Sequence, residues 1–206
     1  MRPNFQRPLL LVLAFVSGAA VLPAQSRNAK DLGVGKFLVA SRGLRDPNFA
    51  ETVILLVEYG EDGAVGLAMN SPTKEPVSRV LQELKGSKGH ADPIFMGGPV
   101  GTEVVFALLR SGAAPKQAVH MFGDVYLVRT KPVLEKVLAA NRSSRTLRIY
   151  AGYSGWGPGQ LEDEVDPRAW YIFSGVPDRV FDSDPASLWS RMIALTERQI
   201  AQSRIH

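Results

Sequence analysis

The segment from residue 150 to residue 164 constrains the fold of this chain more than any other. It reads Tyr-Ala-Gly-Tyr-Ser-Gly-Trp-Gly-Pro-Gly-Gln-Leu-Glu-Asp-Glu, so four glycines and one proline surround a single tryptophan. Glycine loses more conformational freedom on folding than other residues, and glycines at this density indicate an unusual backbone path. We therefore expect either a tight corner between a strand and a helix or a backbone that another group approaches closely.

Apolar runs and turn residues predict strands along most of the remaining chain. Thr52 to Glu58 is rich in β-branched residues and almost continuously apolar, which is typical of a strand buried on both faces. Glu61-Asp62-Gly63 predicts a hairpin turn, with a partner strand from Ala64 to Met69. The other predicted strands are 35–40, 93–96, 102–109, 125–128, 145–151 and 170–173.

Apolar residues at helical spacing predict several helices. Pro76 fits the first position of a short helix that runs to about Leu84, and a second helix is expected over 131–140. The acidic residues after Pro158 predict a helix start there. The last helix begins near Pro185, and its apolar stripe consists of Leu188, Trp189, Met192, Ile193 and Leu195.

These elements predict an α+β fold, in which a single compact domain holds a strongly curved, mixed and mostly antiparallel sheet surrounded by peripheral helices. The chain has 206 residues, which suits one globular domain and an extension. We divide it into a signal peptide at 1–24, a flexible lead-in at 25–34 that lacks periodicity, and the domain at 35–206.

The first residues have the order of a secretory signal peptide. Arg2 and Arg7 form a short positive region, an apolar run follows, and small residues permit cleavage after Ala20 or Ala24. The alternative is an uncleaved membrane anchor, but the apolar run from 9 to 22 is shorter than the ~20 residues that a spanning helix needs. We expect an exported protein, periplasmic or secreted, without a stable transmembrane anchor; the alternative location is the cytoplasm.

Several kinds of site are disfavoured by composition. The chain has no cysteine, which excludes disulfides, thiol nucleophiles and thiolate metal sites. Its three histidines are scattered, and we predict neither a metal site nor a cofactor. Beyond 1–24, 22 basic residues face 20 acidic ones, and the densest basic run (Arg142, Arg145 and Arg148) is typical of a solvated surface. Nucleic-acid binding is therefore not favoured.

Several segments together resemble the YqgE/AlgH family of bacterial proteins. The glycine-tryptophan segment followed by Gln160-Leu161-Glu162 carries the most specific part of the resemblance, and the order and spacing match from Gly35 to Leu195. The matching segments are 35–40, 44–49, 52–56, 63–67 with Asn70 and Pro72, 97–100, and 152–164.

The resemblance implies a compact, curved α+β core and leaves the biochemical activity open. One branch of the family is named as a regulator of alginate synthesis genes, which implies a transcription-linked role. The familiar members look cytoplasmic and lack a leader, so this chain departs from the pattern at its N-terminus. An exported member would not act directly at DNA.

The glycine-rich segment holds the candidate site. On a structural interpretation, the glycines build a corner, Trp156 fills the core, and Glu162 and Glu164 complement the positive end of a helix. On a functional interpretation, exposed backbone N–H groups cradle a ligand. The neighbouring carboxylates would repel an anion, so a cationic or hydroxyl-bearing ligand or a peptide fits better there. The predicted binding cluster is Asn70, Gly98, Pro99, Gly155, Trp156, Gln160 and Glu162.

Ser154 supports a hydrolase alternative. Residues 152–156 nearly match a nucleophile elbow, but Trp156 replaces the small residue that this tight turn requires. A partner base is also doubtful, because the three histidines lie in a loop, beside a predicted strand and at the chain end. We therefore assign no catalytic residue.

The leading hypothesis is a non-catalytic binding or regulatory module in the bacterial envelope, whose partner is an unknown small molecule or protein. A transcription-linked regulator is the first alternative, and a hydrolase that uses Ser154 is the second. Salt-dependent DNA binding would distinguish the first alternative.

Overall fold

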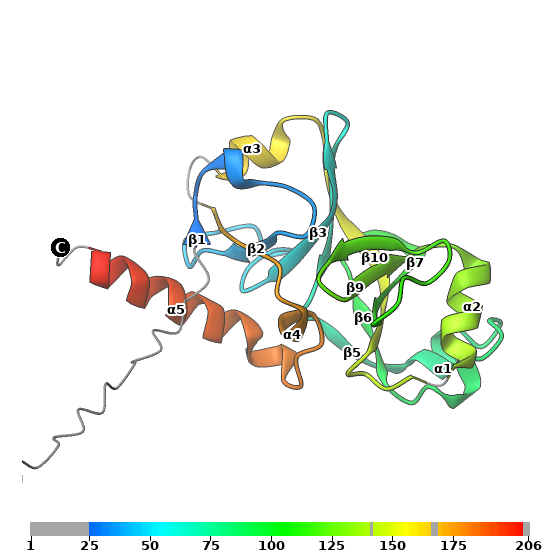
Figure 1. The fold of residues 1–206 in the computed structure, drawn as a ribbon. Coiled ribbons are helices and arrows are strands. Elements are labelled where there is room, and N and C mark those ends of the chain that lie inside the picture. The colour runs from blue at the N-terminus through cyan, green and yellow to red at the C-terminus, as the bar shows by residue number, and fades with distance from the viewer. Residues whose placement is uncertain (1–24, 141, 166–168, 204–206) are drawn as a thin grey trace, which may run out of the picture.

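A computed structural model describes residues 25–140, 142–165 and 169–203, and the predicted signal peptide at 1–24 lies outside them. The described chain is a single α+β domain with eleven strands and short helices around them (Figure 1). Every strand pairing is antiparallel except that between β6 (Pro93–Met96) and β10 (Leu147–Trp156). The predicted fold class, a mixed and mostly antiparallel sheet with peripheral helices, is confirmed.

One hydrogen-bonded path orders nine of the strands. Its sequence is β1 (Gln25–Ser26), β11 (Trp170–Phe173), β2 (Phe37–Ala40), β3 (Val53–Gly60), β4 (Gly63–Ala68), β10, β7 (Val100–Arg110), β9 (Val125–Val128) and β8 (Val119–Phe122). β5 (Pro72–Pro76) is attached through β6, which also pairs with β10. The helical elements are η1 (Ala29–Asp31), α1 (Val77–Val80), η2 (Ser87–Gly89), α2 (Lys131–Ala139), α3 (Gln160–Val165), α4 (Pro177–Val180), η3 (Pro185–Ser187) and α5 (Leu188–Ser203).

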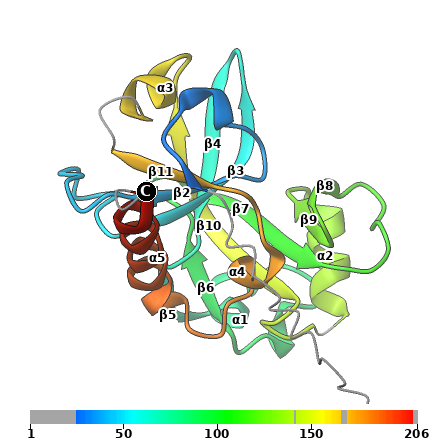
Figure 2. The same cartoon turned by 60° about the vertical axis from the view of Figure 1, so that its left-hand side comes forward.

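β10 joins the two halves of the sheet. Its first residues pair with β7 on one side and β6 on the other, and its last residues pair with β4. Figure 2 shows β10 passing from the strands of one half to those of the other. The strand continues to Trp156, beyond the predicted end at residue 151, so Gly152 and Gly155 lie within a strand. The predicted corner between a strand and a helix is present but shorter than expected, because it is limited to 157–159 and holds only two of the four glycines.

The glycine at position 152 permits a close approach between two backbones. Its φ is 71°, at an irregularity in the register between Ala151 and Tyr153. A Cβ atom there would lie 2.6 Å from the carbonyl oxygen of Gly98 and 3.0 Å from that of Val100. The expectation that another group approaches the backbone of this segment closely is therefore met. That group is the backbone of residues 98–100 of the same chain.

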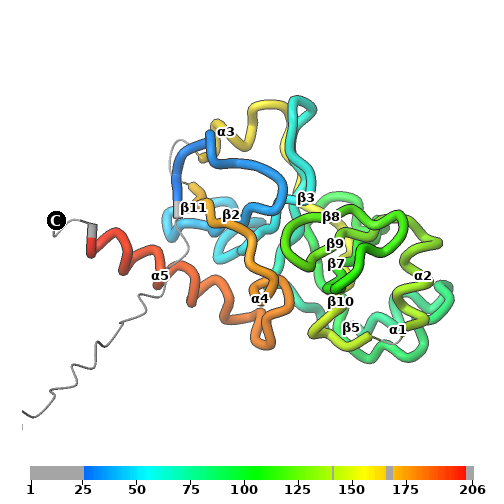
Figure 3. The backbone as a smooth tube through the Cα atoms, in the orientation of Figure 1, coloured from blue at the N-terminus to red at the C-terminus, as the bar shows by residue number. Residues whose placement is uncertain are grey.

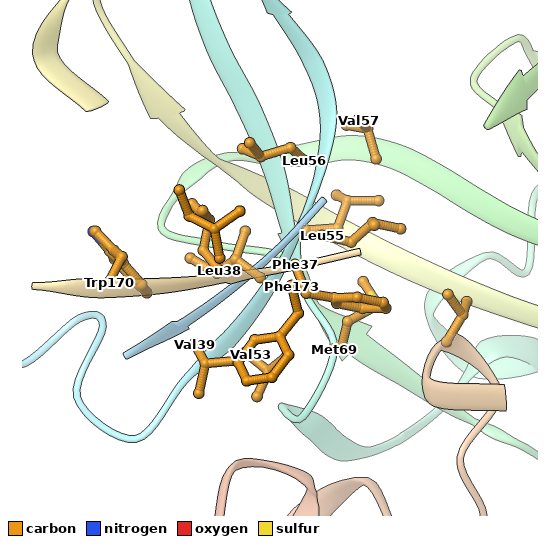
Figure 4. Packing of buried hydrophobic residues seen from close by; sticks show 14 of the residues in the cluster. Phe37, Leu38, Val39, Val53, Leu55, Leu56, Val57, Met69, Trp170 and Phe173 are labelled. Carbon is orange, nitrogen blue, oxygen red and sulfur yellow. The ribbon is translucent and has the colours of Figure 1, made fainter. Parts of the chain in front are cut away.

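The buried side chains form two clusters. The larger one joins β2, β3, β4 and β11 with α5, and Figure 4 shows part of it around Phe37, Leu55 and Phe173. The smaller one lies under α2, whose apolar face packs against the other end of the sheet through Val133, Leu134, Val137 and Leu138. The predicted helix over 131–140 and the buried strand over 52–58 agree with these observations.

Residues 25–34 differ from the expected flexible lead-in. Gln25 and Ser26 pair with Phe173 and Ile172 of β11. The Asn28 side chain caps η1 by accepting a hydrogen bond from the Lys30 N–H, and Leu32 belongs to the larger core. Backbone pairing at a sheet edge leaves no side-chain periodicity, which explains why the sequence pattern did not reveal this segment.

Other predicted bounds also change. The helix expected from Pro76 to Leu84 is limited to one turn, Val77–Val80. β5 and β8 were not predicted, because two-residue alternation is weak in such short edge strands.

The C-terminal chain crosses between the two halves before it ends. It runs from β11 through α4 to α5, and the orange segment of Figure 3 follows this path beneath the sheet. α5 packs on β2, where the Trp189 indole donates a hydrogen bond to the Ala40 carbonyl at 2.8 Å. The predicted apolar stripe of this helix is confirmed at Leu188, Trp189, Met192 and Ile193, which are buried.

Candidate functional site

The tryptophan of the glycine-rich segment is a core residue. Trp156 is 5% exposed and stacks on Phe49, with 5.7 Å between the ring centroids. Its indole N–H donates to Oε2 of Glu164 at 3.0 Å, and the indole N–H of Trp170 donates to the same oxygen at 3.1 Å. One carboxylate of α3 therefore satisfies two tryptophans, which favours the structural interpretation of this segment.

The side chains of Gln160 and Glu162 on α3 are also bonded within the protein. Gln160 accepts a hydrogen bond from the Gly157 N–H at 3.1 Å and donates to Glu164 at 3.2 Å. The Tyr59 hydroxyl donates to Glu162 at 2.5 Å. This bond, together with burial, raises the pKa of Tyr59 to about 12, because losing the proton would remove the donor beside a carboxylate.

Asn70 fixes the loop that precedes β3. Its Oδ1 accepts a hydrogen bond from the Val53 N–H at 2.8 Å, and its Nδ2 donates to the Glu51 carbonyl at 2.9 Å. Glu51 has a φ of 55°, a strained value for a residue with a side chain. The Asn70 side chain therefore holds the backbone on both sides of Thr52 in place.

The seven residues of the predicted cluster fall into neighbouring groups. Gln160 and Glu162 belong to α3, and Trp156 is bonded to that helix through Glu164. Gly98 and Pro99 line a small hollow of about 190 Å³. Phe49 connects the two groups, because it lines that hollow and stacks on Trp156. Asn70 adjoins Ser71, another lining residue, and Gly155 lies on β10 against the Tyr153 ring. Ligand binding at this cluster stays a prediction.

Ser154 lies within a strand and not on an elbow. It is 1% exposed, pairs with Gly66, and donates a long hydrogen bond of 3.4 Å to the Gly97 carbonyl. The ring nitrogens Nε2 of His90 and His120 are bonded to the carbonyl groups of Leu138 and Gly123. In residues 25–140, 142–165 and 169–203, no histidine is hydrogen-bonded to Ser154, and His206 lies outside them.

A larger pocket lies at the first half of β10. It has a volume of about 330 Å³ and is enclosed by β5, α1, β6, β10, and the segment between α4 and η3. Its apolar walls include Val77, Pro93, Phe95, Leu147, Ile149 and Phe181. Its polar lining includes His90, Asp92, Ser144, Arg145, Arg148 and Asp182. Sequence reasoning missed this pocket, because its walls come from segments that are far apart in the chain.

Arg148 is the unusual member of this lining. It is 5% exposed, which corrects the interpretation of the run at 142, 145 and 148 as a solvated surface. Its guanidinium lies over the Phe95 ring, 4.7 Å from the centroid, and its Nη2 donates to the Asp182 carbonyl. Its Nε and Nη1 atoms are buried and make no hydrogen bond. In the sequence, the one signal for the burial of Arg148 was its position in the otherwise apolar strand segment Leu-Arg-Ile-Tyr.

Comparison with known proteins places this architecture in a family. A family model described as AlgH-like matches residues 37–201. This chain belongs to the AlgH-like family. A UPF0301 protein of Streptomyces avermitilis is 36% identical to it, over 81% of this chain and 88% of the relative. A UPF0301 protein of Ruegeria pomeroyi is also 36% identical, over 78% of this chain and 90% of the relative.

Solved structures of similar proteins agree with the AlgH-like fold. The solution structure of the AlgH protein from Pseudomonas aeruginosa aligns with a TM-score of 0.64 at 34% identity, covering 78% of this chain and 86% of that one. A crystal structure of a Corynebacterium diphtheriae protein aligns with a TM-score of 0.65 at 22% identity, covering 78% and 85%. The second likeness shows the fold alone. The predicted family resemblance is thus confirmed.

Membership of the AlgH-like family leaves the chemistry open, since the names of these relatives state no ligand or reaction. Within the part of the chain that the structure describes, no three His, Asp or Glu side chains gather as a metal site would require. None of the helices described is both long and apolar enough to cross a membrane.

Proposed function

We propose that this AlgH-like protein is a non-catalytic binding module whose ligand occupies the pocket beside β10. The observation that carries the proposal is the pocket itself, with a volume of about 330 Å³ and mostly apolar walls. Small-molecule sites are typically concave and apolar, with a few polar groups that fix orientation. Arg148, Asp92 and His90 are polar groups of this kind.

The hydrogen bonds of Ser154 and His90 favour a binding role over catalysis. Ser154 lines the smaller hollow, not this pocket, and its hydroxyl is directed at the Gly97 carbonyl. His90 lines the pocket, but its Nε2 lies 2.7 Å from the Leu138 carbonyl and so serves as a donor there. A nucleophile needs a base within hydrogen-bond reach, and neither side chain supplies such a pair.

Filling the pocket should abolish ligand binding without unfolding the protein. Ser144 lines the pocket, whereas its neighbour Ser143 is exposed and does not. A panel of small organic metabolites is screened by thermal shift against wild type, Ser144→Trp and Ser143→Trp. A ligand at 100 times its Kd stabilises the folded state by about 2.7 kcal/mol, which is readily measured.

We expect stabilisation of wild type and Ser143→Trp, and at least a tenfold loss of affinity in Ser144→Trp. Metabolites that stabilise all three proteins equally would place the ligand elsewhere and contradict the proposal.

We also propose that the module works in the bacterial envelope. The support is the order of charged, apolar and small residues in 1–24. Cleavage after Ala20 or after Ala24 would retain Gln25 and Ser26, which form β1. After cell fractionation, the protein should be found in the same fraction as a periplasmic marker. Mass spectrometry of that protein should give a mature N-terminus at Val21 or Gln25. Intact protein with Met1 in the cytosol would contradict this and favour the transcription-linked alternative.

A further inference from the structure

We infer that the ligand of the pocket beside β10 carries an anionic group, a carboxylate or a phosphate, that binds the Arg148 guanidinium while an apolar body lies against Phe95 and Phe181. This inference rests on the proposed function of the pocket and adds the chemical class of its ligand. It differs from the sequence-based expectation of a cationic or hydroxyl-bearing ligand, which concerned the acidic segment around α3.

The first argument is that the charge of Arg148 is buried without a counter-charge. Its neighbours are the Phe95 ring, the Asp182 carbonyl and the Tyr150 hydroxyl, all of which are neutral. No ion pair with Arg148 is found in the described segments. Burying an unpaired charge is unfavourable, and removing the partner of a buried ion leaves a large penalty. An anionic ligand would supply the missing charge.

The second argument is that no nearby acidic group pairs with Arg148 among the described residues. The Asp182 carboxylate pairs with Arg191 at 2.8 Å and accepts a hydrogen bond from the Asp184 N–H at 2.9 Å. Burial raises the pKa of Tyr150 to about 12, although the charge of Arg148 opposes this, so its hydroxyl stays neutral near pH 7. Asp92 lines the pocket but makes no hydrogen bond to Arg148 among those found. The exposed Arg145 adds a second positive charge to the lining.

The third argument is that the guanidinium has unused donors. Nε and Nη1 make no hydrogen bond, although a guanidinium binds carboxylate and phosphate oxygens through paired N–H groups. Both nitrogens are covered by protein atoms. Binding of an anion by these nitrogens therefore requires the surrounding protein atoms to move, and we expect the segment at 181–183, which lines the pocket with Arg148, to shift as the ligand binds.

The remaining walls specify the rest of the ligand. Phe95, Phe181, Leu147 and Ile149 line the same space as the guanidinium. A ligand that buries apolar surface against these side chains binds more tightly in proportion to the area that it removes from water. The ligand class is thus a small molecule with one anionic group, a carboxylate or a phosphate, and an aromatic or branched aliphatic body.

Three probes of similar shape test the inference: phenylacetate, phenyl phosphate and the neutral phenylacetamide. Calorimetric titration of the full-length mature protein should show at least tenfold tighter binding of one or both anions than of the amide. The tighter anion identifies the head group. Arg148→Met should remove this preference and leave the amide affinity within about twofold of wild type.

Two further variants control the experiment. Arg79→Met removes one exposed positive charge outside the pocket and should leave all three affinities unchanged. Arg148→Lys keeps a charge but loses the planar fork, so it should weaken anion binding even if Arg148→Met folds poorly.

The outcomes separate the two proposals. Amide binding as tight as that of the anions, or an unchanged anion preference in both Arg148 variants, would overturn the inference and leave the binding pocket intact. Binding of no probe at millimolar concentration, together with failure of the metabolite screen, would overturn the proposed function and the inference with it.

Discussion

Replacing Gly152 with alanine should lower the free energy of unfolding by roughly 3 kcal/mol or more. The new Cβ would lie 2.6 Å from the Gly98 carbonyl oxygen, which belongs to backbone and cannot rotate away. The φ of 71° adds strain for any residue with a side chain. Since small domains are stable by only about 5–15 kcal/mol, the change removes a large share of the total.

Urea denaturation of Gly152→Ala measures this effect, and Gly157→Ala is the matched control in the same glycine-rich segment. The nearest heavy atom to a Cβ at Gly157 is 3.9 Å away, and its φ lies outside the left-handed region. We expect no loss of stability in the control. Equal midpoints for Gly152→Ala and wild type would show that the two backbones can separate without cost.

Glu164→Ala should lower the free energy of unfolding by about 3 kcal/mol, because two buried indole donors lose their acceptor. Trp156 and Trp170 both donate to Oε2 of this residue, and both rings belong to the larger core. Glu164→Gln keeps one carbonyl oxygen but removes the charge, so it should lower the free energy of unfolding by about half as much.

Asp163→Ala is the control for Glu164→Ala, since Asp163 is the adjacent acidic residue of α3 and is exposed. Its removal should change stability by less than about 1 kcal/mol, the usual range for an acid in a first helical turn. Tryptophan fluorescence during denaturation follows the unfolding of the core that holds both indoles together with Trp189. Similar losses for the two alanine variants would mean that the indole bonds contribute little.

The fold class was predictable because the strongest patterns were long and local. The apolar run in β3 and the stripe of α5 each report burial of their own residues, and the structure agrees with both. The exact path of β10 was not predictable, because Gly152 and Gly155 carry no side chain that alternates between faces.

The site was harder to predict, because it depends on residues that meet only in three dimensions. Asn70 was included in the predicted cluster, but its backbone partners at Glu51 and Val53 are set by the fold and not by a spacing along the chain. The pocket beside β10 needs Val77, Phe95, Arg148 and Phe181 at once, and no spacing along the chain relates them. Arg148 also looks like any surface arginine until the strand that holds it is known to be buried.

The position of β10 has a consequence for how this protein acquires its shape. Residues 147–156 supply an interior strand to both parts of the sheet, and their partners in β4, β6 and β7 lie far away in the sequence. Neither part can close before these pairings form, and pairings between distant segments are slow to form. Folding is therefore expected to be cooperative, with the two parts of the sheet acquiring lasting structure together.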